Sequence, residues 1–84
     1  MSTPHHNQLR WACRRGLLEL DKFLLTFFDD CYDDLSLAEK QDFVTLLNEA
    51  DQDLYNWLLG VSSAPTPAWQ SLCDKIRAHA QKVL

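Results

Sequence analysis

Hydrophobic and polar residues follow a helical spacing along most of the 84-residue chain. Between residues 17 and 31 the apolar residues recur at steps of three and four, which is typical of a central bundle helix. An acidic cluster at residues 29–34 follows, and acids at a helix C-terminus oppose the macrodipole, so we expect this helix to end near Asp30. Its expected apolar face comprises Leu17, Leu20, Leu24, Phe27, Phe28 and Cys31, widened by Leu18, Phe23 and Leu25.

Local start and stop signals predict three further helices. Ser36 and Glu39 form a capping box that opens the first of them. Asp51 is expected to cap the second, with Gly60 just beyond its end. A Thr-Pro pair at residues 66–67 supplies the cap and the first residue of the third. The expected apolar residues of these helices are Phe43, Val44, Leu46, Leu47, Ala50, Leu54, Tyr55, Trp57, Leu58, Leu59, Trp69, Leu72, Cys73, Ile76, Ala80 and Val83. Most should lie in the core, while Tyr55 and Trp57 could instead form a binding platform.

A short leading helix is expected to begin around Asn7, after a polar tail over residues 1–7. Gly16 should interrupt or end it, because glycine inside a helix costs about 1 kcal/mol relative to alanine. A chain of this length buries only roughly 60–65% of its unfolded surface and forms one core without a deep cleft. The sequence therefore predicts an all-α fold: a single domain over residues 1–84, built as a small bundle of about five helices.

Charge is distributed unevenly along the chain, with a net +2 over residues 1–28, −8 over residues 29–53 and +2 over residues 54–84. Such a molecule suits a protein partner better than a nucleic acid, whose binding depends on phosphate neutralisation. The three cysteines are odd in number and form no C-x-x-C pair, so we expect reduced residues in apolar positions. With no secretory signal and no apolar run long enough to span a membrane, we expect a cytoplasmic protein.

Catalytic and metal-binding patterns are missing from the sequence. His5 and His6 fall in the tail, and no Ser, Cys or Asp has a histidine partner by local spacing, although distant residues could still converge. The two glycines cannot form a phosphate-binding loop, and the acidic cluster lacks the spacing of an EF-hand. We therefore expect no metal site, and a binding or assembly role rather than an enzyme.

The exception is the stretch from Leu9 to Asp21, where charges and a glycine interrupt the apolar pattern. One interpretation is that Gly16 only permits the turn between the first two helices and that the arginines are solvated. The other is that Gly16 omits a side chain so that a partner's backbone can approach, with Arg15 as a donor fork and Glu19 as an acceptor. On a helix Arg15 and Glu19 would be one turn apart, but such a pair stabilises by only a few tenths of a kcal/mol. Trp11 could anchor the partner.

Two linked motifs, Arg15-Gly16-x-x-Glu19 and Asp51-x-Asp53-Leu54-x-x-Trp57-Leu58, resemble the pattern of the succinate dehydrogenase flavinylation factors, the bacterial SdhE family. The resemblance covers about residues 8–60. It implies a five-helix bundle that binds the flavoprotein subunit of succinate dehydrogenase, and of the related fumarate reductase, and promotes covalent attachment of FAD to a histidine of that subunit. FAD then belongs to the partner, and the chain itself is expected to hold no stable cofactor. The resemblance implies a monomer, while exposed Trp and Phe side chains could support a dimer.

The resemblance also implies which residues contact the partner. The motif positions are joined by neighbours that extend or border the surface, giving Arg15, Gly16, Glu19, Arg10, Trp11, Arg14, Asp51 and Asp53. Three other functions stay open at this point: a regulatory module such as an antitoxin-like adaptor, a nucleic-acid binder that uses the arginines, and a small enzyme built from distant residues.

Overall fold

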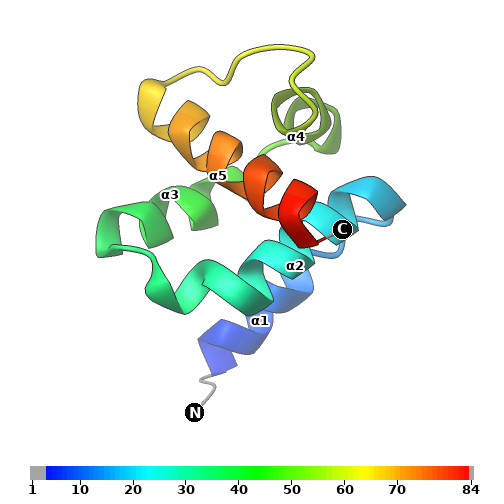
Figure 1. The fold of residues 1–84 in the computed structure, drawn as a ribbon. Coiled ribbons are helices and arrows are strands. Elements are labelled where there is room, and N and C mark those ends of the chain that lie inside the picture. Colours follow the sequence, from blue (N-terminus) through cyan, green and yellow to red (C-terminus); the bar gives the residue numbers. More distant parts are fainter. Residues whose placement is uncertain (1–3, 84) are drawn as a thin grey trace.

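The computed structural model describes residues 4–83, with side chains described from Asn7 onward. Within this range the chain forms α-helices and one short 3-10 helix, and no strand, so the all-α prediction is confirmed (Figure 1). The elements are α1 (Pro4–Ala12), α2 (Leu18–Cys31), η1 (Tyr32–Asp34), α3 (Leu37–Leu46), α4 (Asp51–Leu58) and α5 (Pro67–Val83).

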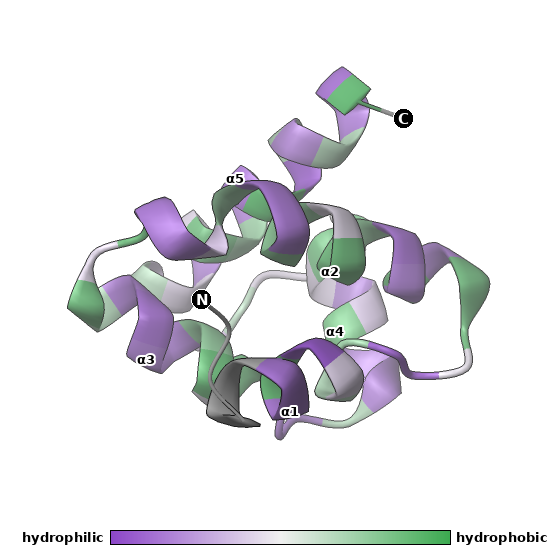
Figure 2. Ribbon diagram, turned by 90° about the horizontal axis from the view of Figure 1, so that it is seen from below, coloured by the Kyte–Doolittle hydropathy of each residue, from purple (hydrophilic) through white to green (hydrophobic). Residues whose placement is uncertain are grey.

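Helices α2 and α5 form the centre of the bundle. α2 packs against α1, α4 and α5, and α5 also packs against α3 and α4 (Figure 1). Apolar and polar segments alternate along the labelled helices, as expected for amphipathic helices around one core (Figure 2). The largest fully buried side chains are Phe43, Leu20, Leu24, Leu46, Leu54, Leu58, Leu72, Ile76, Cys13 and Cys73.

Two of the predicted helix starts are confirmed in atomic detail. The Glu39 N–H donates to Ser36 Oγ and the Ser36 N–H donates to Glu39 Oε1, each over 3.1 Å, which completes the capping box of α3. The Trp69 N–H donates to Thr66 Oγ1 over 3.1 Å at the start of α5. The Glu39 carboxylate also receives a hydrogen bond from the Lys75 ammonium and so ties α3 to α5.

Other helix ends differ from the prediction. Helix α1 begins at Pro4, three residues earlier than expected, while residues 1–3 and the side chains of His5 and His6 lie outside the described part. Ala50, not Asp51, is the N-cap of α4, and it makes no side-chain capping bond. Gly60, with φ of +78°, follows the C-cap residue of α4 as predicted.

Several expected core positions lie closer to solvent. Val44, Tyr55, Leu59 and Trp69 are half-buried. Ala50 is exposed between α3 and α4, and Val83 is exposed at the last residue of α5. Leu17, the N-cap residue of α2, and Leu18, its first residue, are also exposed. Helical periodicity identified the right faces here and overestimated how far toward each helix end those faces are covered.

Candidate functional site: the turn at Gly16

The turn between α1 and α2 has a backbone conformation that favours glycine. Residues 14–17 are not helical, and Gly16 has φ of +83°, in the left-handed region that L-residues rarely adopt. The backbone N–H of Arg15 donates to Asp21 Oδ1 over 2.6 Å, so a side chain from the first turn of α2 closes the turn. The turn that Gly16 was expected to permit is therefore present, but the expectation that the arginines are solvated is wrong for Arg15, whose side chain is only 17% exposed.

The space around Gly16 is open. A Cβ atom placed on Gly16 meets no atom of the described residues within 4 Å. Packing within this chain thus does not require the missing side chain, and any side chain at this position would project outward. The surface at Gly16 consequently offers bare backbone to an approaching molecule.

Arg15 points inward and joins three helix ends. Its Nη1 donates to the carbonyl oxygen of Leu47 over 2.6 Å and to that of Ala12 over 3.2 Å. Its Nη2 donates to the carbonyl oxygen of Glu49 over 2.9 Å, and its Nε donates to Asp51 Oδ1 over 2.7 Å. The last carbonyls of a helix lack intrahelical donors, so one guanidinium satisfies the ends of α1 and α3 and holds the start of α4.

These bonds change the role expected of Arg15. Its side chain is only 17% exposed, and four of the five guanidinium N–H groups bond within the chain. The ion partner of Arg15 is Asp51, and the helical pair of Arg15 with Glu19 does not form, because the Gly16 turn separates them. Glu19 is exposed and makes no hydrogen bond or ion pair with any residue in the described range.

Three large apolar side chains are exposed beside the turn. Trp11 is 72% exposed, Leu17 43% and Leu18 71%, although Leu17 and Leu18 were expected in the core. The Arg14 guanidinium lies 5.5 Å from the centre of the Trp11 ring, in cation–π geometry. The chain thus exposes large apolar side chains before and after Gly16, a feature common at interaction surfaces. Trp11 and Glu19 are thus exposed as expected, whereas Arg15 between them is not.

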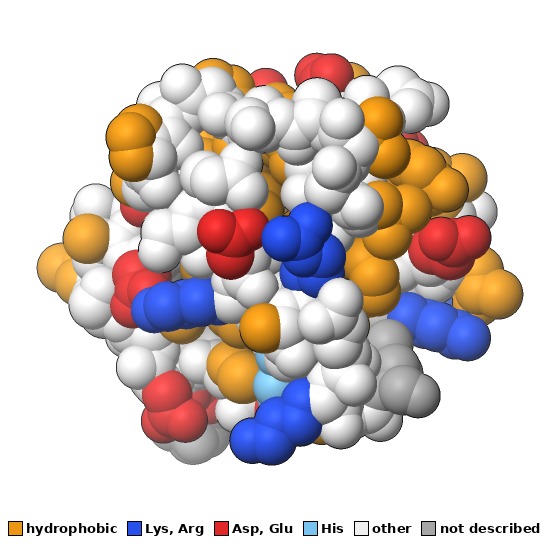
Figure 3. Space-filling model, turned by 45° about the horizontal axis from the view of Figure 1, so that its top comes forward, with side chains coloured by type: hydrophobic (Ala, Val, Ile, Leu, Met, Phe, Trp, Pro, Cys, Tyr) orange, Lys and Arg blue, Asp and Glu red, His pale blue; other side chains and the backbone are white. Residues whose placement is uncertain are grey.

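The remaining predicted residues lie outside this arrangement. Arg10 forms a bidentate ion pair with Asp29, over 2.8 and 3.0 Å, which ties α1 to the end of α2, and Asp29 raises the pKa of Arg10. Asp53 is exposed on α4 and has no hydrogen bond or ion pair among residues 4–83. Figure 3 shows apolar side chains gathered on one side of the molecule, interspersed with charged groups.

Sequence reasoning missed the groups that hold the turn. Asp21 carries a local signal, since an acid in the first turn of α2 can reach back to the preceding N–H groups. The contacts of Arg15 with Leu47 and Glu49 use backbone carbonyls and therefore leave no trace in residue identity. Only the pairing with Asp51 had a sequence signal, through the linked spacing of the two motifs.

Distant residues do converge at one other place. His79 Nε2 lies 2.9 Å from Asp30 Oδ2, and its Nδ1 lies 3.5 Å from Cys31 Sγ. Burial, followed by the charges of Asp30 and Asp34, raises the pKa of Cys31, so the cluster favours the thiol over a nucleophilic thiolate. Among the side chains described, from Asn7 to Val83, no three of His, Cys, Asp or Glu are placed to hold a metal ion. No helix in the described range is long and apolar enough to cross a membrane.

An all-α bundle that presents an open glycine turn beside exposed apolar side chains has the features of a protein-binding factor. Residues 7–80 match the family described as the flavinator of succinate dehydrogenase, and the chain belongs to that family, as the motifs predicted. FAD assembly factor SdhE of Photobacterium profundum is 46% identical over 79 residues, covering 94% of this chain and 90% of the relative.

Two further relatives agree with this assignment. FAD assembly factor SdhE of Vibrio vulnificus is 45% identical over 78 residues, covering 93% of this chain and 91% of the relative. The solution structure of a UPF0350 protein superposes with a TM-score of 0.77 at 40% identity, covering 98% of this chain and 88% of that one. The five-helix architecture is therefore shared with a homologous solved structure.

Proposed function

We propose that this chain binds the flavoprotein subunit of succinate dehydrogenase and promotes the covalent attachment of FAD to it. Membership of the flavinator family and the names of the SdhE relatives support this role. The flavoprotein of fumarate reductase, as a related subunit, is the second partner that we propose. The observation that carries the proposal is the Gly16 turn, where backbone is open to a partner and large apolar side chains stand exposed.

Each residue of the turn has a separate role in this proposal. Gly16 lets the partner's backbone approach, and Glu19 accepts hydrogen bonds from partner N–H groups. Trp11, Leu17 and Leu18 become buried at the interface and contribute most of its hydrophobic stabilisation. Arg15 is a positioning residue that holds the turn, and Arg14 keeps the Trp11 ring in place.

The chain acts by binding, as a monomer, without a catalytic side chain of its own. FAD and the histidine that receives it belong to the flavoprotein, and this chain binds no flavin stably. It holds the immature flavoprotein in a conformation in which histidine and flavin are positioned for bond formation. Orientation of this kind lowers a barrier without adding a reacting group.

The Gly16→Asn variant tests the contact directly. Asparagine tolerates the left-handed conformation better than other side chains, so the turn should persist while the open space is filled. Apo flavoprotein is incubated with FAD and the variant, and covalently bound flavin is measured by in-gel fluorescence. The melting temperature of the variant is measured separately. We expect near-native melting and little covalent flavin. Full flavinylation by Gly16→Asn would show that only the backbone conformation matters.

The antitoxin-like alternative makes a different prediction. If the chain regulates another protein through the same surface, a deletion strain keeps its normal level of covalent flavin. In that case the purified chain would also fail to accelerate flavinylation in vitro, and the proposed function would be wrong.

A further inference from the structure

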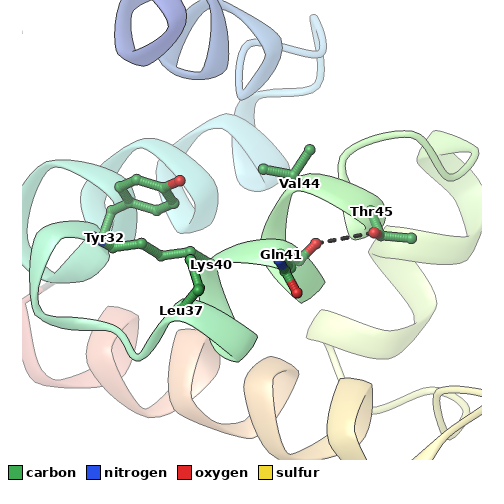
Figure 4. Close-up of a pocket in the computed structure, with 6 residues that line it drawn as sticks. All are labelled: Tyr32, Leu37, Lys40, Gln41, Val44 and Thr45. Atoms are coloured by element: carbon green, nitrogen blue, oxygen red, sulfur yellow. Dashed lines mark hydrogen bonds between the residues drawn. The ribbon is translucent and has the colours of Figure 1, made fainter. Parts of the chain in front are cut away.

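The solvent-facing side of helix α3 carries apolar side chains among polar ones such as Gln41 and Thr45. Its inner face buries Phe43, Leu46 and Leu47, yet its outer face begins with Leu37, which is 73% exposed, and continues with half-buried Val44. Together with η1 this face forms a shallow pocket of about 420 Å³ (Figure 4). We call it the α3 pocket; it is lined by Tyr32, Leu37, Lys40, Gln41, Val44 and Thr45.

Charge sets this pocket apart from its surroundings. Residues 29–53 carry nine acids and one base, but no acid lines the pocket, and the single base, Lys40, does. The Lys40 side chain runs toward Tyr32, and its ammonium lies 5.4 Å from the centre of that ring (Figure 4). Lys40 has no ion pair with any acid in residues 4–83, despite the acidic surroundings. An apolar floor beside an unpaired cation is complementary to an apolar side chain with a carboxylate next to it.

The pocket is connected to the Gly16 turn through α3. Arg15 of the turn bonds to the carbonyl of Leu47, which lies one helical turn beyond Val44. The pocket residues span two turns of α3, from Leu37 to Thr45, a length of about 12 Å that matches a short peptide segment rather than a compact ligand. A protein interface of ordinary size covers about 800 Å² on each partner and can include both places.

We infer that the α3 pocket is a second anchoring site for the flavoprotein partner and accepts a segment with an apolar side chain and a neighbouring carboxylate. The apolar side chain packs on Leu37 and Val44, and the carboxylate pairs with Lys40. This inference rests on the proposed function, since it assigns a second contact to the same partner. Lys40 is then the one residue of the acidic segment 29–53 that attracts an acidic group of the partner.

Two variants probe the pocket while preserving the fold. Leu37→Asp places an acid at the first residue of α3, where the helix macrodipole favours it, and Lys40→Glu reverses the charge of the pocket. Matched controls are Val61→Asp, an exposed apolar residue between α4 and α5, and Lys82→Glu, an exposed lysine on α5. The Kd for purified apo flavoprotein subunit is measured for each by titration calorimetry, after circular dichroism confirms folding.

We expect each pocket variant to weaken binding about tenfold and each control to leave it within about twofold. The difference between wild type and Lys40→Glu should shrink with added salt, because the Lys40 contact is ionic. Wild-type affinity in both pocket variants, alongside loss of binding in Gly16→Asn, would overturn this inference and leave the proposed function intact. Equal weakening in the controls would also overturn it.

Two other results would count against the pocket as a flavoprotein site. If the wild-type chain does not bind the flavoprotein at all, both this inference and the proposed function fail. If sedimentation instead shows a dimer of this chain that Leu37→Asp dissociates, a second copy covers the pocket and the inference is wrong.

Discussion

Replacing Arg15 should lower stability before it affects any contact with a partner. The guanidinium makes three hydrogen bonds to carbonyl oxygens and one ion pair with Asp51, and its side chain is 17% exposed. Arg15→Ala removes all four interactions at once and leaves the carbonyls at the ends of α1 and α3 without their donor. Arg15→Lys keeps the positive charge but replaces a planar fork with a single ammonium, which cannot reach all of these acceptors.

The magnitude follows from the individual contacts. A hydrogen bond to a charged group contributes about 1.5–3 kcal/mol when it is shielded from water, and the three carbonyl bonds are only partly shielded. The pair with Asp51, whose side chain is 42% exposed, adds about 0.5–1 kcal/mol after allowance for solvent screening. We expect a loss of about 3–4 kcal/mol for Arg15→Ala and about 1–2 kcal/mol for Arg15→Lys. For a domain of this size the former lowers Tm by roughly 15–25 °C.

Urea denaturation followed by circular dichroism measures these losses, and flavinylation is assayed below the Tm of each variant. Asp51→Asn is the matched control, because it removes the ionic partner and leaves the carbonyl bonds, at a cost of about 0.5–1 kcal/mol. If Arg15→Lys unfolds at the same urea concentration as wild type and yet fails to support flavinylation, Arg15 contacts the partner directly, and the positioning role assigned to it is refuted.

Two further predictions concern other parts of the bundle. The hydrogen bond from Lys75, followed by the backbone hydrogen bond at Ser36, lowers the pKa of Glu39 in the folded protein. The Glu39 carboxylate therefore stabilises the fold at pH values above its unfolded pKa, and this stabilisation is lost as the pH falls through its folded pKa. The stability advantage of wild type over Glu39→Gln should therefore shrink between about pH 6 and about pH 3 in urea titrations, and an advantage independent of pH would contradict this. Burial raises the pKa of Cys13 to about 12 and that of Cys73 to about 11, whereas Cys31 is half-exposed, so iodoacetamide should label Cys31 first in the native protein. Equal labelling of all three thiols in mass spectra of intact protein would show that the core opens readily.

The parts of the fold that could be predicted from sequence depend on local interactions. The capping box at Ser36 and the cap at Thr66 involve residues three apart, so residue identity alone specifies them. The exposure of Leu17 and Leu18 could not be predicted in this way, because these residues have the same apolar spacing as buried Leu20 and depend on where α2 begins relative to its neighbours.

The residues of the candidate site also differ in whether they could be predicted from the sequence. Gly16 and Glu19 could be selected from sequence, since a glycine and an acid are conspicuous in an apolar helical pattern. The inward direction of Arg15 could not, because three of its four partners are backbone carbonyls, two of which are more than thirty residues away. An arginine that supports the fold and one that contacts a partner look alike in a linear motif. The hydrogen-bond acceptors around Arg15 separate the two roles.

The contacts of Arg15 also bear on peptide mimicry of this surface. A synthetic peptide covering residues 7–21 contains every residue of the first motif, yet it lacks the carbonyls of Leu47 and Glu49 and the carboxylate of Asp51 that fix Arg15. In such a peptide the turn has to become ordered upon binding, with a backbone entropy cost of about 1–2 kcal/mol for each residue that becomes fixed. The isolated motif should therefore compete poorly with the intact protein, and an inhibitor that imitates this surface needs a rigid replacement for the ends of α3 and α4.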